Sequence, residues 1–346
     1  MKKTLMVAIA TFFMLGATAQ HKHTEMKQLD TTDHYTFQLS DKVTRKKVTF
    51  KNRFGITLSG DLYIPKSIGT SPLPAIAISG PYGAVKEQSS GLYANQLALR
   101  GFITLAFDPS YTGESSGEPR NISSPDINTE DFSAAVDYLG VQNNIDRNKI
   151  GIIGICGFGG YALNAAAPDK RIKAVATSTM YDISRGAANG YYDKKTSEER
   201  LNEYVQIGEQ RWKDVQNGTP AYGATGLANV AENAPQFVKE YAAYYRTDRG
   251  FHPRSLNSNA SWSLTNAVTN MNAPILAYIR EISPRPVLII AGEKAHSRYF
   301  SETAYENAAS PKELVIVPNA VHTDLYDKID IIPFDKMEAF FKQNLK

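Results

Sequence analysis

The chain has 346 residues, of which 42% are hydrophobic and 21% charged, with a formal net charge of +3 and one cysteine. This is the composition of an ordinary globular protein, and it has no basic stripe of the kind that binds nucleic acid. The length allows one large domain with an insertion, or two domains, and the sequence contains no internal repeat.

Residues 1–19 have the three parts of a secretory signal peptide. Two lysines precede a mostly apolar run at 5–15, and Ala-Thr-Ala at 17–19 is a cleavage site before Gln20. The apolar run is too short to span a membrane comfortably. We therefore expect an exported protein, located in the periplasm or outside the cell, without stable membrane insertion. The polar segment 20–42 is predicted to be an N-terminal arm.

The next part of the chain alternates predicted strands and helices. Residues 47–52 and 56–64 alternate apolar and polar side chains around Arg53-Phe54-Gly55, which indicates a β-hairpin. Continuous apolar runs, typical of buried parallel strands, then alternate with helical patterns: strands at 75–80, 102–108, 149–155 and 172–179, helices at about 87–100 and 131–139. The pattern predicts a mostly parallel, doubly wound sheet.

Residues 183–282 interrupt this alternation. They contain charged helical stretches at 197–212 and 234–246, both tryptophans and no apolar strand, so we expect an inserted helical cap. The segment is rich in tyrosine, and most of these rings are expected to pack inside the cap, while a minority could face an aromatic or sugar-bearing substrate. They are Tyr191, Tyr192, Tyr204, Tyr222, Tyr241, Tyr244, Tyr245 and Tyr278, with Tyr181 at the edge.

The sheet is predicted to resume after the cap. Strands are expected at 286–292 and 312–318, separated by a helix at 302–309, and an amphipathic helix at 335–345 closes the chain.

The segment 149–167 carries the strongest chemical signal. It passes from an apolar, β-branched run through a glycine-rich centre around Cys156 to an alanine-rich stretch, which predicts strand, sharp turn and helix. Cys156 would stand at the apex of the turn, where the first N–H groups of the helix could stabilise an anion. In an oxidising compartment a lone cysteine is either buried and inert or a reactive thiol.

This segment resembles the nucleophile elbow of the α/β-hydrolase fold, in the cysteine form of the dienelactone hydrolases, Gly-x-Cys-x-Gly-Gly. Phe158 stands where those families usually have glycine. The sequence of this segment more closely resembles that of a group of bacterial hydrolase-like proteins with Gly-Ile-Cys-Gly-aromatic-Gly-Gly. The segment 61–65, at the end of the hairpin, is similar to that of exported and peptidase-like members of the fold, and Pro-Tyr-Gly at 81–83 is similar to acyl esterases and X-Pro dipeptidyl peptidases.

The resemblance implies an α/β-hydrolase fold with a definite division of the chain. The expected parts are a signal peptide (1–19), an N-terminal arm (20–42), the first part of the hydrolase core (43–182), a helical cap (183–282) and the second part of the core (283–346).

The resemblance also implies roles for individual residues. Cys156 would be the nucleophile, and His322, in the loop after the last strand, the general base. The oxyanion hole would be formed by Tyr82 and Gly157. In the esterases and peptidases the tyrosine hydroxyl itself points at the oxyanion. If His322 activates Cys156, the thiol should ionise well below its reference pKa of about 8.5.

The acid of the triad is not evident. The family pattern Gly-x-x-Asp would place aspartate at Ala295. Glu293 or Asp182 could orient the imidazole instead, and we favour Asp182, at the end of the preceding strand. A cysteine nucleophile tolerates a missing acid better than serine does. No role is assigned to the neighbouring residues at 296 and 297.

These residues predict an exported hydrolase of carboxylic esters, thioesters or lactones that acts on a small-molecule acyl substrate. The sequence shows no cluster of metal ligands, and no cofactor is expected. The oligomeric state stays open.

Two alternatives compete with the hydrolase. Residues 157–162 also fit the dinucleotide-binding pattern G-x-G-x-x-A, with Asp182 at a suitable distance to bind a ribose. Export, and the lack of a second glycine-rich strand turn near the amino terminus, argue against such an oxidoreductase. The missing aspartate leaves room for a hydrolase-fold binding protein without catalytic activity.

Overall fold

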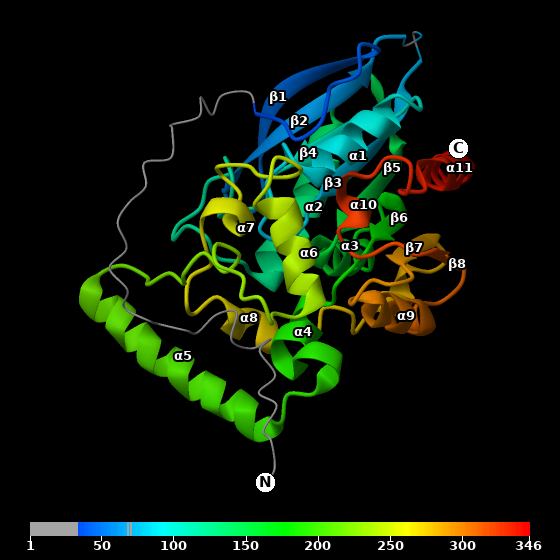
Figure 1. Ribbon diagram of the computed structural model, residues 1–346. Helices are drawn as coiled ribbons and strands as arrows, with labels where there is room; N and C mark the ends of the chain where they lie inside the picture. Colours follow the sequence, from blue (N-terminus) through cyan, green and yellow to red (C-terminus); the bar gives the residue numbers. More distant parts are fainter. Residues whose placement is uncertain (1–33, 68, 70) are drawn as a thin grey trace.

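The computed structural model describes residues 34–346 apart from 68 and 70. The predicted signal peptide and the first part of the arm therefore lie outside the described residues. An eight-stranded sheet forms the centre of the molecule, in the order β1-β2-β4-β3-β5-β6-β7-β8 (Figure 1). The strands are β1 (Val43–Lys51), β2 (Thr57–Pro65), β3 (Leu73–Ser79), β4 (Ile103–Phe107), β5 (Ile145–Ile155), β6 (Ile172–Ser178), β7 (Val287–Gly292) and β8 (Lys312–Val317).

The predicted hairpin and the parallel sheet are both confirmed. β1 pairs antiparallel with β2, and β2 pairs antiparallel with β4. All other neighbouring strands are parallel. Because parallel strands share the direction of their carboxyl ends, the loops after β3, β5, β6, β7 and β8 meet at one edge of the sheet.

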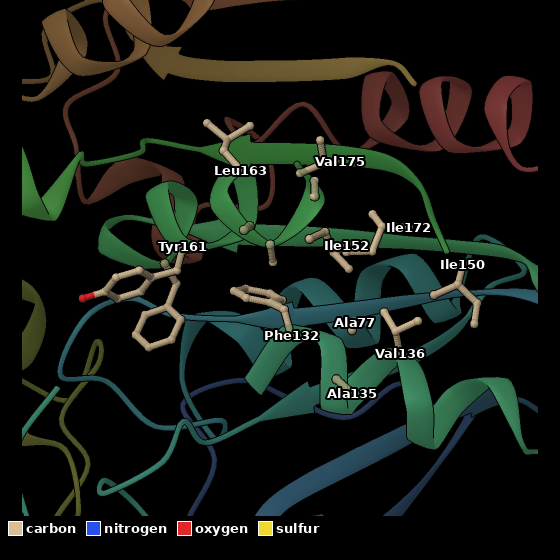
Figure 2. Packing of buried hydrophobic residues seen from close by; sticks show 14 of the residues in the cluster. Ala77, Phe132, Ala135, Val136, Ile150, Ile152, Tyr161, Leu163, Ile172 and Val175 are labelled. Atoms are coloured by element: carbon tan, nitrogen blue, oxygen red, sulfur yellow. The ribbon is translucent and has the colours of Figure 1, made fainter. Parts of the chain in front are cut away.

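Helices cover both faces of the sheet. α1 (Ser89–Ala98) and α11 (Phe334–Asn344) pack on one face, and α2 (Pro125–Gly140) and α3 (Gly157–Ala166) on the other. Figure 2 shows the second interface, where Phe132 of α2 and Leu163 of α3 lie with Ile152 of β5 in one apolar cluster. The remaining core helices are α9 (Arg298–Asn307) and α10 (Asp324–Asp327).

Two helix boundaries differ from the sequence prediction for identifiable reasons. α2 begins six residues before the expected start, because Pro125 occupies the first turn, where its missing N–H costs nothing. The helix expected at 197–212 continues to Asn217, and Gly218 ends it in the left-handed conformation.

The segment between β6 and β7 is helical. It contains α4 (Ile183–Asn189), η2 (Tyr191–Asp193), α5 (Ser197–Asn217), α6 (Gln236–Tyr245), α7 (Leu256–Asn259), α8 (Ala267–Met271) and η3 (Ile279–Ile282). Within the described residues its β-pairing is limited to one isolated bridge, between Tyr222 and Ser263. In Figure 1 the long helix α5 stands farthest from the sheet. We call this segment the cap.

Polar contacts join the cap to the loop after β3. Ser255 Oγ donates to the carbonyl of Gly83 (2.9 Å), and Asn257 Nδ2 donates to the carbonyl of Tyr82 (2.8 Å). Arg254 forms an ion pair with buried Glu87 at 2.5 Å. The cap therefore helps to fix the loop in which we expect an oxyanion donor. Over the residues that the structure describes, none of the helices has the length and apolar character needed to cross a bilayer.

Candidate active site

Cys156 stands at the turn between β5 and α3 with backbone angles φ 54° and ψ −126°. A positive φ at a residue with a side chain costs of order 1–3 kcal/mol. Three backbone hydrogen bonds hold this conformation: the Cys156 N–H donates to Ser178 (3.0 Å), and its carbonyl accepts from Gly159 and Tyr181 (both 2.9 Å). The strain thus presents the thiol beyond the end of the sheet.

Two glycines let the loop after β3 approach this turn. A Cβ on Gly157 would lie 2.8 Å from Cβ of Tyr82, and one on Gly80, which has φ 99°, would lie 2.3 Å from the carbonyl oxygen of Ile155. Phe158 does not disturb the approach, since its ring is buried beside those of Phe132 and Tyr161. An aromatic residue at this point of the elbow is part of the core.

Four donors surround the Cys156 sulfur. Burial raises the pKa of the thiol above its ordinary value, and four hydrogen bonds oppose that shift: from the Tyr326 hydroxyl, the Tyr82 and Gly157 backbone N–H groups, and the Tyr241 hydroxyl. The net direction is upward, opposite to the lowering of the thiol pKa that was expected from the sequence. Its cause is that no cation faces the sulfur among these contacts, and desolvation dominates.

The Tyr82 backbone faces the sulfur, whereas its hydroxyl is engaged elsewhere. The hydroxyl lies 2.6 Å from Ser123 Oγ and accepts a hydrogen bond from Asn266 Nδ2 (2.8 Å). Its ring stacks on Trp262 with centroids 4.2 Å apart. Of the two ways in which Tyr82 was expected to act, the structure therefore favours the N–H over the hydroxyl.

His322 is fully buried in the loop between β8 and α10. Its Nδ1 lies 2.9 Å from Thr179 Oγ1 and 2.6 Å from Ser297 Oγ, and its Nε2 lies 2.9 Å from the Tyr326 hydroxyl. Burial, and then the neighbouring His296, lower the pKa of His322 well below the usual value. The imidazole is therefore neutral, and hydroxyl groups orient it.

The two carboxylates expected to orient His322 lie elsewhere. Asp182 is the N-cap of α4 and accepts a hydrogen bond from the Arg185 N–H (2.9 Å). The exposed Glu293 accepts from the Asn319 N–H (2.8 Å). Among the described residues His322 has no hydrogen bond to a carboxylate, so the structure does not place either residue in the position of the acid. Each accepts from a backbone N–H, in its own turn for Asp182 and in the loop after β8 for Glu293.

Several residues near His322 were missed by sequence reasoning. Tyr326 follows His322 by four residues, about one helical turn, and this spacing was the available signal. Ser297 stands two residues after the alanine that replaces the usual aspartate. Thr179 has a positive φ of 45°, which is rare for a β-branched residue and indicates a constrained position.

Aromatic side chains surround the ring of His322. His296 Nε2 lies 2.6 Å from the Tyr181 hydroxyl and 3.4 Å from the Tyr241 hydroxyl. The rings of His296 and His322 have centroids 4.9 Å apart. Burial lowers the pKa of His296 to about 3, so it too is neutral. The cap thus contributes the Tyr241 hydroxyl to His296 and to the thiol.

Cys156 opens into a cavity of about 250 Å³ between the core and the cap. No charged side chain lines it among the described residues; aromatic rings, including Tyr181, Phe237, Tyr241 and Trp262, form much of the wall. An uncompensated charge is costly in such surroundings. The cavity therefore suits an uncharged group.

The dinucleotide alternative does not agree with the fold. In this sheet β4 lies between β2 and β3, and β2 is antiparallel to β4. Dinucleotide-binding domains have a different strand order. The start of α3 is closed by packing, since a Cβ on Gly159 would meet Cβ of Met180 at 2.5 Å. Asp182, which was to bind a ribose, caps α4 instead.

Comparisons with known proteins agree with this architecture. The chain is 59% identical over 320 residues to the uncharacterized protein PA2218 of Pseudomonas aeruginosa. The match covers 92% of this chain and 86% of PA2218. The crystal structure of PA2218 superposes with a TM-score of 0.88 at 57% identity, over 94% of this chain and all of that one. No family model matches the sequence.

Two more distant similarities concern the fold and a shorter segment. The crystal structure of the α/β hydrolase GrgF from Penicillium has a TM-score of 0.73 at 23% identity, over 87% of this chain and 99% of GrgF, which shows the α/β-hydrolase fold. A stretch of 136 residues is 34% identical to the thiohydrolase aneE of Aspergillus aculeatus and covers 39% of this chain and 42% of aneE.

Proposed function

The chain belongs to the same family of α/β-hydrolase-fold proteins as PA2218, and from this premise we propose that it hydrolyses carboxylic thioesters and esters, including lactones, through an acyl intermediate on Cys156. One observation carries the proposal. Cys156 stands at a strained strand-to-helix turn and lines a cavity with Tyr326, whose hydroxyl lies 2.9 Å from Nε2 of His322, and the Tyr82 and Gly157 N–H groups oppose the rise in the pKa of its thiol. This is the set of groups that acyl transfer to a thiol needs.

The first step moves the thiol proton toward His322. A neutral imidazole that accepts at Nε2 carries its proton on Nδ1, which donates to Ser297 Oγ or Thr179 Oγ1. Tyr326 then gives its hydroxyl proton to Nε2 and takes the proton of Cys156. The sulfur attacks the acyl carbon as its proton leaves, so that no free thiolate needs to exist in the resting site.

The attack places negative charge on the former carbonyl oxygen. The N–H groups of Tyr82 and Gly157 donate to this oxyanion, as they do to the sulfur at rest. When the intermediate collapses, the leaving thiolate or alkoxide takes the proton back from His322 through Tyr326. Water then loses a proton to His322 and attacks the thioester on Cys156, which restores the free thiol and releases the acid.

Thioesters are the first substrates to test. Attack by Cys156 on a thioester exchanges one carbon–sulfur acyl bond for another and expels a good leaving group. Such a reaction needs little proton transfer to the leaving group, so a weakly basic histidine is sufficient. The relative aneE is named a thiohydrolase, which supports the same choice.

The test is a panel of acyl thioesters, aryl esters and lactones, assayed with the wild-type protein and with Cys156→Ala and Cys156→Ser. We expect thioester turnover that Cys156→Ala abolishes. Equal rates for wild type and Cys156→Ala would remove the nucleophile. No turnover of any panel member, and no acylated protein, would favour the hydrolase-fold binding protein instead.

A further inference from the structure

A second cavity lies beside the Cys156 cavity and has no part in the proposed chemistry. Its volume is about 170 Å³, and it is bordered by Gly186 and Ala187 of α4, by Phe300 of α9 and, at one side, by Lys195 and Glu203. We call it the α4 chamber. Resting on the proposed function, we propose that the α4 chamber binds an uncharged hydrocarbon tail of the substrate whose acyl carbon reacts at Cys156.

The two cavities are neighbours. Tyr82, Tyr181, Ile183 and Phe237 line both of them, so the partition between them is no thicker than one layer of side chains. Ligand sites usually have volumes from about 300 Å³ upward. Each cavity alone is smaller than that value, and the two together exceed it. One elongated substrate could therefore use both, with a rotation of a shared side chain as the only rearrangement.

Gly186 keeps the α4 chamber open at a position where the fold does not need glycine. It lies inside a helix, where glycine is less favourable than alanine, and it does not have a positive φ. A Cβ at this position would find its nearest neighbour, Cζ of Phe300, at 3.5 Å, which is ordinary van der Waals contact. An alanine would fit at this position, so the backbone conformation does not require glycine. The missing side chain instead adds to the volume of the α4 chamber.

The charges beside the chamber are already paired. Lys195 Nζ lies 2.6 Å from Glu203 Oε2 and donates to the carbonyl of Ala187 at 2.7 Å, and its side chain is only 6% exposed. Among the described residues that line it, the chamber therefore offers no free cation to a carboxylate or phosphate. An apolar tail can lie against this wall without breaking an ion pair, and its transfer out of water lowers the free energy.

The test blocks the chamber without touching Cys156. Gly186→Leu fills it, Gly186→Ala is the conservative control, and Gly208→Leu on α5 adds the same side chain in a helix where a Cβ meets nothing within 4 Å. One substrate series varies the acyl group from acetyl to octanoyl on a constant 4-nitrophenol. A second keeps acetyl constant and varies the thiol from ethanethiol to octanethiol, so that the two arms distinguish an acyl tail from a leaving-group tail.

We expect Gly186→Leu to lower kcat/KM at least about tenfold for the long member of one series and to change the short member less than about threefold, with both controls near wild type. Equal effects on short and long members of both series would overturn the proposal. A binding measurement separates this result from failure of the hydrolase itself: in the Cys156→Ala background, calorimetry should show that 2-undecanone binds and that adding Gly186→Leu weakens it at least about tenfold. Unchanged ketone binding would count equally against the chamber.

Discussion

The Tyr326 hydroxyl lies 2.9 Å from Nε2 of His322 and is also a hydrogen-bond partner of the Cys156 sulfur. The described residues show no direct hydrogen bond between Cys156 and His322. The Tyr326 hydroxyl therefore lies between the Cys156 thiol and the His322 imidazole, which contact each other directly in a simple dyad. The proton path from Cys156 to His322 includes one residue more than the sequence predicted.

Removal of that hydroxyl should interrupt the path. Tyr326→Phe keeps the buried ring and is expected to lower kcat by about 100-fold, the lower end of what general acid–base groups contribute. Tyr244→Phe is the matched control, because its ring packs against Tyr326 (centroids 5.1 Å apart) and its hydroxyl contacts neither Cys156 nor His322. Steady-state kinetics with an acyl thioester measure both. Similar losses in the two variants would assign Tyr326 a packing role only.

The orientation of His322 by hydroxyls makes a second prediction. Ser297→Ala should lower kcat about tenfold, since it removes the closer of two hydrogen bonds to Nδ1. Asp182→Asn and Glu293→Gln should stay within about threefold of wild type, because neither carboxylate touches the imidazole. A tenfold loss in either carboxylate variant, with an unchanged melting temperature, would contradict this arrangement.

The pH dependence of thiol reactivity follows from the raised pKa of Cys156. A higher pKa means less thiolate at a given pH, so alkylation by iodoacetamide should stay slow through neutral pH and rise only above the reference value of about 8.5. Since Cys156 is the only cysteine, the rate can be followed by whole-protein mass, with glutathione as the control thiol. A rate that reaches a plateau below pH 7 would show a thiolate–imidazolium pair instead.

Export is a separate prediction from the first nineteen residues. Expression of the full chain in a bacterium should give a protein outside the cytoplasm whose first residue is Gln20. Amino-terminal sequencing and cell fractionation measure this. Lys2→Glu together with Lys3→Glu should delay processing, and an uncleaved cytoplasmic protein from the unaltered gene would refute the signal peptide.

Much of the fold follows from local patterns in the sequence. The continuous apolar runs that became β3, β5 and β7 are buried on both sides, and their regular spacing predicts a parallel sheet. Cys156 could be placed at the elbow because small neighbours are required wherever a chain turns so sharply. The Gly157 contact with Tyr82 is the physical form of that requirement.

The polar partners of His322 could not be predicted in the same way. Thr179 follows β6, Ser297 precedes α9 and Tyr326 lies in α10, and which of their hydroxyls reach the imidazole depends on side-chain geometry rather than on periodicity. Asp182 and Glu293 were attractive because they are charged and near strand ends. Asp182 instead accepts from the Arg185 N–H three residues on, and Glu293 accepts from the Asn319 N–H in the loop after β8; sequence spacing does not reveal this competition.

The central claim is that Cys156 carries the acyl group, and trapping that intermediate tests it most directly. The wild type and His322→Asn are mixed with octanoyl thioester, quenched in acid within seconds, and analysed as whole proteins and as peptides by mass spectrometry. The account predicts an octanoyl adduct on Cys156 in the wild type that is absent from Cys156→Ala and that forms and decays more slowly in His322→Asn, because His322 is the base of both steps. Thioester turnover without any adduct on Cys156, or the same adduct in Cys156→Ala, would contradict it.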